Sequence, residues 1–207
     1  MQQLLNRFYR WFFLGWFGLV DRLFFRQQHW QALILDSQKP VLLLGNHISW
    51  WDGAWMLLRN AEHWKRRFNV LMLESELQKR PFLAALGAIG LPKGRQQLHT
   101  LTQLQALAKD PANLLLIFPE GSIGAAQAPT LHFQKGLLNR LHLPDWQVVF
   151  VFSAVEFLNQ PRPSRFHYLQ TYAAVDAATL ETAYQLFKAQ SQQQLASGIA
   201  ARLREKP

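Results

Sequence analysis

A histidine and an aspartate five positions apart, His47 and Asp52, are the strongest candidates for catalytic residues in this sequence. They stand in the stretch Val41–Asp52, where four apolar residues run into Gly45 and Ser49 begins a helix-start pattern. This order predicts a buried strand, a short loop that carries His47, and a helix. The five-residue step to Asp52 lets the acid fold back onto the imidazole. That geometry is typical of a general base and the acid that orients it.

The same spacing also has a purely structural interpretation. Ser49 and Asp52 fit a capping box, in which a serine begins a helix and an acid three residues later bonds back to its backbone. The two interpretations are compatible, because a helix N-terminus favours the neutral imidazole that a base requires. A His-x4-Asp pair also arises by chance, so other features of the chain are needed to distinguish a catalytic pair from a purely structural one.

A second cluster, Phe118-Pro119-Glu120-Gly121-Ser122, also follows an apolar run that predicts a strand. The backbone N–H groups of Gly121 and Ser122 can hold an anion or an oxyanion, and Glu120 can bind acceptor hydroxyls. Taken alone, this pattern is more typical of a turn that ends a strand.

Basic residues in two loops are candidates for binding a phosphate. Lys93 and Arg95 lie in a Gly/Pro-rich loop, and Lys135 lies in the segment Phe133-Gln134-Lys135-Gly136. Solvated surface charge is the alternative for each of them.

Strands and helices are expected to alternate, which predicts an α/β fold with a mainly parallel sheet flanked by helices. No long linker divides the chain, so residues 31–207 are expected to form one domain. The expected strands are Val41–Leu44, Phe68–Leu73, a short strand within Gly87–Arg95, Asn113–Phe118, Val148–Phe157 and Arg165–Ala174. The expected helices are Trp50–Glu62, Pro81–Leu86, Gln97–Lys109 and Leu180–Arg204. The segment Phe133–Leu143 is expected to begin with a turn at Gly136 and to continue as a helix.

Residues 1–30 are the most apolar and aromatic part of the chain. The apolar run Trp11–Val20 is about half of the roughly 20 residues that a spanning helix needs, so it should not cross a bilayer alone. Arginines flank the run, which predicts an amphipathic helix or helical hairpin in the membrane interface. A signal peptide fits poorly, because Asp21 and Arg22 follow where a cleavage site would be. The alternative is a hydrophobic helix packed on the core.

The amino-acid composition helps to distinguish a nucleic acid from a membrane surface as the partner of this basic chain. The formal charge is +9 and the pI about 10.3, yet only 17% of the residues are charged and 13% are aromatic. A nucleic-acid binder usually reaches such a pI with dense Lys and Arg, whereas eight Trp and fifteen Phe suit an anionic membrane surface. The chain contains no Cys, which excludes disulfides, zinc thiolates and a cysteine nucleophile.

Together and in this order, the clusters resemble the blocks of the lysophospholipid acyltransferase family, which includes 1-acylglycerol-3-phosphate acyltransferases. The blocks are Asn46-His47-x4-Asp52, the loop Lys93–Arg95, Phe118–Ser122 and Phe133–Gly136. Two departures concern the phosphate site: Ser122-Ile123 stands where the family often has Thr-Arg, and Lys93 and Arg95 compete for the place of one Arg.

The resemblance implies an O-acyltransferase in which His47 deprotonates the acceptor hydroxyl, supported by Asp52. The hydroxyl attacks an acyl thioester of coenzyme A or acyl carrier protein, and no metal or bound cofactor is needed. The residues assigned to substrate binding are Asn46, Lys93, Arg95, Glu120, Gly121, Ser122 and Lys135.

The resemblance further implies a monotopic protein whose partners are membrane lipid and the acyl donor, at the cytoplasmic face of a bacterial inner membrane. Three alternatives stay open at this point. The chain can be a lipid-binding protein of the same fold without activity, a thioesterase in which His47 and Asp52 activate water, or a basic nucleic-acid-binding domain.

Overall fold

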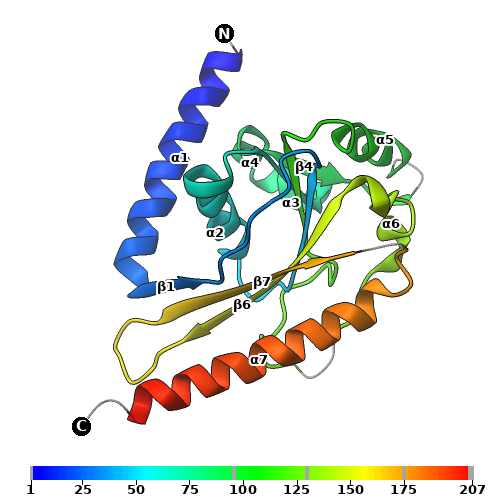
Figure 1. Ribbon diagram of the computed structural model, residues 1–207. Coiled ribbons are helices and arrows are strands. Elements are labelled where there is room, and N and C mark those ends of the chain that lie inside the picture. Colours follow the sequence, from blue (N-terminus) through cyan, green and yellow to red (C-terminus); the bar gives the residue numbers. More distant parts are fainter. Residues whose placement is uncertain (1, 95–96, 129–130, 174–175, 205–207) are drawn as a thin grey trace.

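The computed structural model describes residues 2–94, 97–128, 131–173 and 176–204. Within them the chain forms a seven-stranded sheet in the order β1-β7-β6-β2-β5-β3-β4, with helices on both faces (Figure 1). The strands are β1 (Gln27–Trp30), β2 (Val41–Gly45), β3 (Arg67–Leu73), β4 (Ala88–Leu91), β5 (Asn113–Ile117), β6 (Gln147–Glu156) and β7 (Ser164–Tyr172). All neighbouring pairs are parallel except β6 and β7, which confirms the expected mainly parallel α/β fold.

The helices include one at each end of the chain. They are α1 (Gln2–Phe24), α2 (Asp52–Arg59), α3 (Glu74–Lys79), α4 (Phe82–Ala85), α5 (Gln97–Leu107), α6 (Lys135–Leu138) and α7 (Leu180–Arg204). A π-helical turn, η1 (Asn60–Trp64), extends α2, and a 3-10 turn, η3 (Leu143–Asp145), precedes β6.

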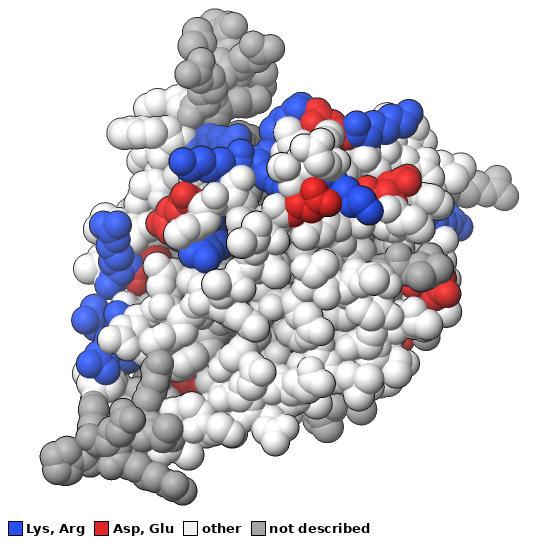
Figure 2. Space-filling view, viewed as in Figure 1, with Lys and Arg blue, Asp and Glu red and all other residues white. Residues whose placement is uncertain are grey.

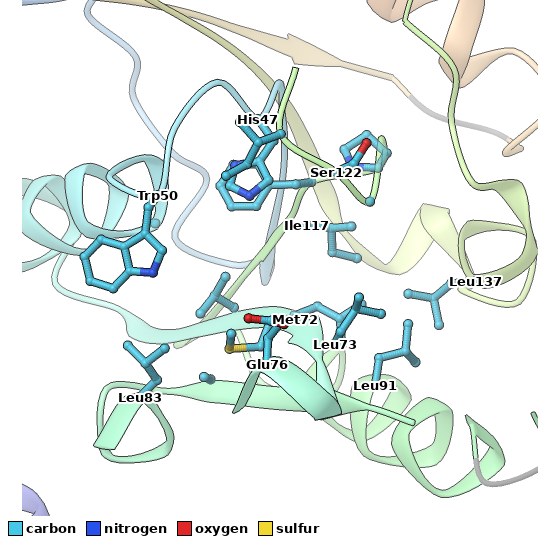
Figure 3. A pocket seen from close by; sticks show the side chains of 18 of the residues that line it. His47, Trp50, Met72, Leu73, Glu76, Leu83, Leu91, Ile117, Ser122 and Leu137 are labelled. Carbon is cyan, nitrogen blue, oxygen red and sulfur yellow. The ribbon is translucent and has the colours of Figure 1, made fainter. Parts of the chain in front are cut away.

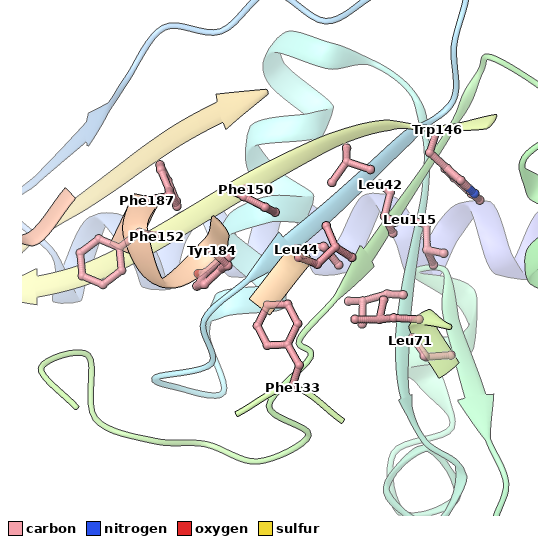
Figure 4. Packing of buried hydrophobic residues seen from close by; sticks show 14 of the residues in the cluster. Leu42, Leu44, Leu71, Leu115, Phe133, Trp146, Phe150, Phe152, Tyr184 and Phe187 are labelled. Carbon is pink, nitrogen blue, oxygen red and sulfur yellow. The ribbon is translucent and has the colours of Figure 1, made fainter. Parts of the chain in front are cut away.

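The central strand β2 shows why the chain forms three layers. Side chains alternate between the faces of a strand, and all four residues from Val41 to Leu44 are fully buried. Val41 and Leu43 pack into a core shared with α1 and α2. Leu42 and Leu44 pack on the opposite face with residues of α5 and α7 (Figure 4). Both faces of the sheet are therefore covered, as the continuous apolar run predicts.

The expected helix Phe133–Leu143 is wrong over most of its length. Only Lys135–Leu138 is α-helical, and a 3-10 turn follows at Leu143–Asp145. Pro144 explains part of the difference, since proline has no N–H to donate and is tolerated only in the first turn of a helix, as here in the 3-10 turn. β1 and α3 were not expected, because four residues of mixed polarity and a single polar helical turn carry too little periodicity to detect.

The N-terminal segment consists of the single helix α1 followed by β1. Strand β1 pairs in parallel with β7, so the last residues of the segment 1–30 belong to the sheet. Phe17 of α1 is buried against the domain, whereas the N-terminal part of the helix extends beyond it (Figure 1). Across the described part of the chain, no helix combines the length and apolarity that crossing a membrane requires.

A buried ion pair fastens α1 to the sheet. Arg165 Nη2 of β7 lies 2.6 Å from Asp21 Oδ2 of α1, and both residues are buried. The guanidinium also lies over the rings of Phe25 and Trp55, 5.0 and 5.1 Å from their centroids. Burial raises the pKa of Asp21, and the charge of Arg165 acts in the opposite direction. Loss of either residue would therefore leave the charge of the other buried without a counter-charge.

We expect Asp21→Ala to lower the free energy of unfolding by about 3–5 kcal/mol, because it leaves the Arg165 charge buried without a counter-charge. The double variant Asp21→Leu/Arg165→Met should recover most of that loss, since two apolar side chains replace both charges. Denaturant unfolding followed by circular dichroism measures both effects. Wild-type stability of Asp21→Ala would show that the pair does not fasten α1.

Candidate active site

The site forms where two parallel strands end side by side. β2 and β5 are neighbours in the sheet, and Leu44 pairs with Ile117. The loops that follow these strands therefore begin at the same edge, where α/β sheets commonly bind ligands. The His47 N–H donates to Glu120 Oε1 at 3.1 Å, and the Gly124 N–H donates to the His47 carbonyl at 2.7 Å. The loop after β5 thus holds the backbone of His47 from both sides.

His47 and Asp52 form a close pair at the start of α2. His47 Nδ1 lies 2.9 Å from Asp52 Oδ2, and the same oxygen accepts the backbone N–H groups of Ile48 at 2.7 Å and Ser49 at 2.9 Å. Ser49 Oγ accepts the Trp51 N–H at 2.8 Å. One carboxylate oxygen therefore makes both contacts that the spacing allows: it accepts the Ser49 N–H, as the acid of a capping box does, and it lies against the imidazole.

The pair leaves the other imidazole nitrogen available. Because a carboxylate can only accept, the contact with Asp52 places a proton on Nδ1 of His47. Among the described residues, Nε2 has no hydrogen-bond partner. The ring stacks on Phe118, with centroids 4.3 Å apart and planes 13° apart, and its side chain is 23% exposed. A neutral imidazole in this tautomer can accept a proton at Nε2.

A pocket of about 540 Å³ begins at His47. Figure 3 shows His47 and Ser122 on one side of it, and Met72, Leu83 and Leu91 on the opposite side. Its wall is mostly apolar and comes from α1, α2, β3, α3, α4, β4, α5, β5 and α6, with Glu76 of α3 and Arg80 among the few charged residues. The size and the apolar wall with few polar groups are typical of a ligand pocket.

Glu120 contacts the His47 backbone and does not contribute to the pocket wall. It is half-buried, and burial raises the pKa of its carboxyl. The bond from the His47 N–H and the charge of Lys188 lower that pKa, while the charge of Asp52 raises it. Glu120 is therefore placed to hold the His47 loop.

Gly121 and Ser122 line the pocket, as residues of a substrate site should. Gly121 has a φ of +70°, and a Cβ there would lie 2.3 Å from the Gln134 side chain. Its N–H donates to the Phe118 carbonyl at 3.1 Å, so the turn itself uses this donor. Gln134 also binds the turn, since its N–H donates to the Pro119 carbonyl at 2.8 Å. The two separated sequence clusters therefore pack together.

The structure places Asn46 away from the pocket. It is 3% exposed; its side-chain Nδ2 donates to the Ser153 carbonyl at 2.9 Å, and its Oδ1 accepts the Ser153 N–H at 2.8 Å. The amide thus holds the end of β2 to β6.

The structure says less about the three basic residues that are candidates for binding a phosphate. Lys93 is exposed in the loop after β4 and does not line the pocket. Arg95 and the side chain of Lys135 lie outside the described part of the structure.

Two residues of α7 near the site were not identified from the sequence. The Tyr184 hydroxyl donates to the Val151 carbonyl at 2.6 Å, and Lys188 is 3% exposed. Their four-residue spacing places Lys188 on the buried face of α7 with Tyr184, which is the signal that could have revealed it. Within the described residues, no group of three or more His, Asp or Glu side chains is arranged to hold a metal ion.

Comparison with known proteins agrees with the expected acyltransferase. The family model described as Acyltransferase matches residues 26–151. The fold is similar to the crystal structure of the 1-acyl-sn-glycerophosphate acyltransferase PlsC from Thermotoga maritima, with a TM-score of 0.52 and 12% sequence identity. That match covers 100% of this chain and 84% of the other. No curated protein sequence gives a significant match. Because the family model spans more than half of its residues, this chain belongs to the acyltransferase family.

Proposed function

We propose that this enzyme transfers a fatty acyl group from an acyl thioester to a hydroxyl of a lysophospholipid or related lipid acceptor. The observation that carries the proposal is the His47–Asp52 pair at 2.9 Å, with His47 on the wall of an apolar pocket. The name of the Thermotoga maritima protein supports a 1-acyl-sn-glycerophosphate acceptor. The donor is coenzyme A or acyl carrier protein carrying the acyl group.

His47 is the general base of the proposed reaction. Its Nε2 takes the proton of the acceptor hydroxyl while the oxygen attacks the thioester carbonyl. The tetrahedral intermediate then collapses: the C–S bond breaks and the imidazolium returns the proton to the departing sulfur. Asp52 orients the ring and stabilises the imidazolium. The products are an ester and a free thiol, so the base is regenerated.

The pocket is suited to the acyl chain. Its wall beyond His47 contains the apolar side chains of β3, α4 and β4, and an alkyl chain gains free energy by leaving water for such a surface. Gly121 and Ser122 lie on the same wall as His47 and are proposed to contact the reacting end of the substrate. Asn46 and Glu120 are proposed to act indirectly, because each holds a strand end or loop that carries His47.

We also propose that α1 binds the membrane surface. One side of the helix is apolar and exposed, with Trp11 75%, Trp16 51% and Leu23 60% exposed. The opposite side packs on the domain. The ring of Phe13 stacks on that of Phe82 with centroids 4.4 Å apart, and the centroids of Phe17 and Trp50 are 5.9 Å apart. Figure 2 shows Lys and Arg along the edge of the molecule on which α1 lies. Aromatic and basic side chains together favour an anionic lipid surface.

His47→Ala should lower the rate of acyl transfer about 10²- to 10⁴-fold, because the general base is lost. Asp52→Asn should also impair transfer, although an amide oxygen can still accept the backbone N–H groups at the helix start. Mass spectrometry of the lipid products measures transfer, with acyl-CoA or acyl-ACP and a panel of lysolipids and glycolipids.

His142→Ala is the matched control for this experiment. His142 Nδ1 lies 2.8 Å from Asp145 Oδ1, but this pair is exposed and lies outside the pocket, so its loss should not affect transfer. Near-native turnover of His47→Ala would refute the assignment. Release of free fatty acid without an acceptor would instead indicate a thioesterase.

Replacing Trp11, Phe12 and Trp16 by Ser should weaken vesicle binding, because these exposed side chains supply the burial that the membrane contact needs. A deletion of residues 1–30 is a poorer test, since it removes β1 and the buried Phe17 as well. Flotation with anionic vesicles at low and high salt measures binding. Leu186→Ser, at an exposed position of α7, is the control. Unchanged flotation of the triple variant would place the membrane contact elsewhere.

If the acceptor carries a phosphate, Lys93→Ala or Arg95→Ala should raise the apparent KM for the acceptor more than that for the thioester. Arg95 is the better candidate for a bidentate contact, which Lys cannot reproduce. Steady-state kinetics of each variant, with lysophosphatidic acid and with an uncharged lipid alcohol as acceptor, measure these KM values. Equal, small effects on both acceptors would show that these cations are solvated surface charge.

A further inference from the structure

Among the residues that the structure describes, three glycines line the pocket that begins at His47. Gly121 has a φ of +70°, so its turn favours glycine. Gly136 is exposed, so a side chain there could turn into solvent. Gly53 differs from both, because it is half-buried in the first turn of α2 and its φ is not positive. The backbone of Gly53 therefore does not explain why this residue lacks a side chain.

Packing does not explain the glycine at this position either. A Cβ added at Gly53 would meet nothing within 4 Å besides its chain neighbours and the backbone of its own helix. Glycine also weakens a helix, because it loses more backbone freedom on folding than any other residue. The free space beside Gly53 belongs to the pocket. The missing side chain therefore enlarges the pocket and destabilises the helix.

The pocket wall on either side of Gly53 is apolar and becomes more buried along α2. Trp50, in the turn before the helix, is 44% exposed, whereas Leu57 is 2% exposed, and both line the pocket. Residues four apart lie on the same side of a helix, so Leu57 continues the wall one turn beyond Gly53. Figure 3 shows Trp50 across the pocket from Leu83. An alkyl chain that runs from Trp50 toward Leu57 therefore passes Gly53.

The position of Gly53 in the chain indicates which alkyl chain this is. Gly53 directly follows Asp52, whose carboxylate contacts His47. In an acyl thioester the alkyl chain begins at the carbon next to the reacting carbonyl. In a lysophospholipid an ester group and glycerol carbons separate the chain from the reacting hydroxyl. The transferred chain is therefore the one that meets the wall next to the His47–Asp52 pair.

We propose that Gly53 is a specificity-determining residue, whose missing side chain leaves room for the transferred acyl chain and thereby sets the chain length that the enzyme accepts. The inference rests on the proposed acyl transfer and adds to it the residue that selects the donor. A side chain at position 53 would occupy space that carbons of the acyl chain need. Long chains that extend past Gly53 would lose this space, whereas short chains would lose little.

Gly53→Leu in the full chain is the principal test, with acyl donors of graded length. The substitution should lower the ratio of kcat/KM for a palmitoyl donor to kcat/KM for a butyryl donor about 10- to 200-fold, the usual discrimination for a methylene that does not fit an apolar pocket. Gly53→Ala should lower the same ratio by less. Gly53→Ala should also raise the denaturant concentration at the unfolding midpoint, since alanine favours the helix and its Cβ has free space.

Gly198→Leu is the matched control. Gly198 also lies in a helix, α7, and a Cβ there would meet nothing within 4 Å, but the residue is exposed and does not line the pocket that begins at His47. Its ratio of palmitoyl to butyryl transfer should equal that of the wild type. An unchanged ratio in Gly53→Leu would overturn the inference, and so would a lowered unfolding midpoint in Gly53→Ala. A shift that follows the length of the acceptor's own chain would overturn the assignment to the transferred chain.

A binding measurement that does not depend on activity separates this inference from the proposed function. Palmitic acid should displace the fluorescent fatty acid cis-parinaric acid from the wild-type protein and from Gly198→Leu at lower concentrations than from Gly53→Leu. Equal displacement from all three proteins would overturn the inference. Weaker palmitate binding by Gly53→Leu, in a protein whose wild type transfers no acyl group, would support Gly53 as part of an alkyl-chain site and refute the proposed function alone.

Discussion

The parallel pairing of β2 with β5 is the constraint on which the site depends. Because these strands run in the same direction and in register, their following loops begin at one edge of the sheet. The loop after β2 carries His47, and the loop after β5 supplies Glu120 and Gly124, which bind the N–H and the carbonyl of His47. A histidine on an unsupported loop would sample many orientations. Here the backbone is held on both sides and Asp52 holds the ring.

Buried charges hold the terminal helices to this central sheet. Asp21 and Arg165 join α1 to β7, and Lys188 joins α7 to the loop after the Glu120 turn. Such groups are expensive to bury and add little net stability compared with apolar packing. They do specify one arrangement, because a shifted helix would leave a charge without its partner.

Helix α1 packs on the domain with one side and leaves the other side apolar and exposed. Its inner side contributes Phe17 to the core and contacts the residues around the pocket, including Phe82 and Trp50. Its outer side leaves Trp11 and Trp16 exposed. The helix for which we propose membrane binding therefore also contributes Phe17 to the pocket wall.

The fold class, most of the elements and the His47–Asp52 pair can be predicted from the sequence, because each depends on the local spacing of residues. The apolar run Val41–Leu44 and the five-residue step to Asp52 act within one strand, loop and helical turn. Contacts between distant residues could not be predicted and are seen only in the folded chain: the Glu120 contact with His47 spans 73 positions, and the Lys188 contact with Ala128 spans 60. The same holds for the contact of Asn46 with Ser153, the pairing of β1 with the sheet and the short helix after Gln134. The periodicity of apolar residues predicts which face of a helix or strand is buried. The order of the strands in the sheet determines which loops and helices come into contact.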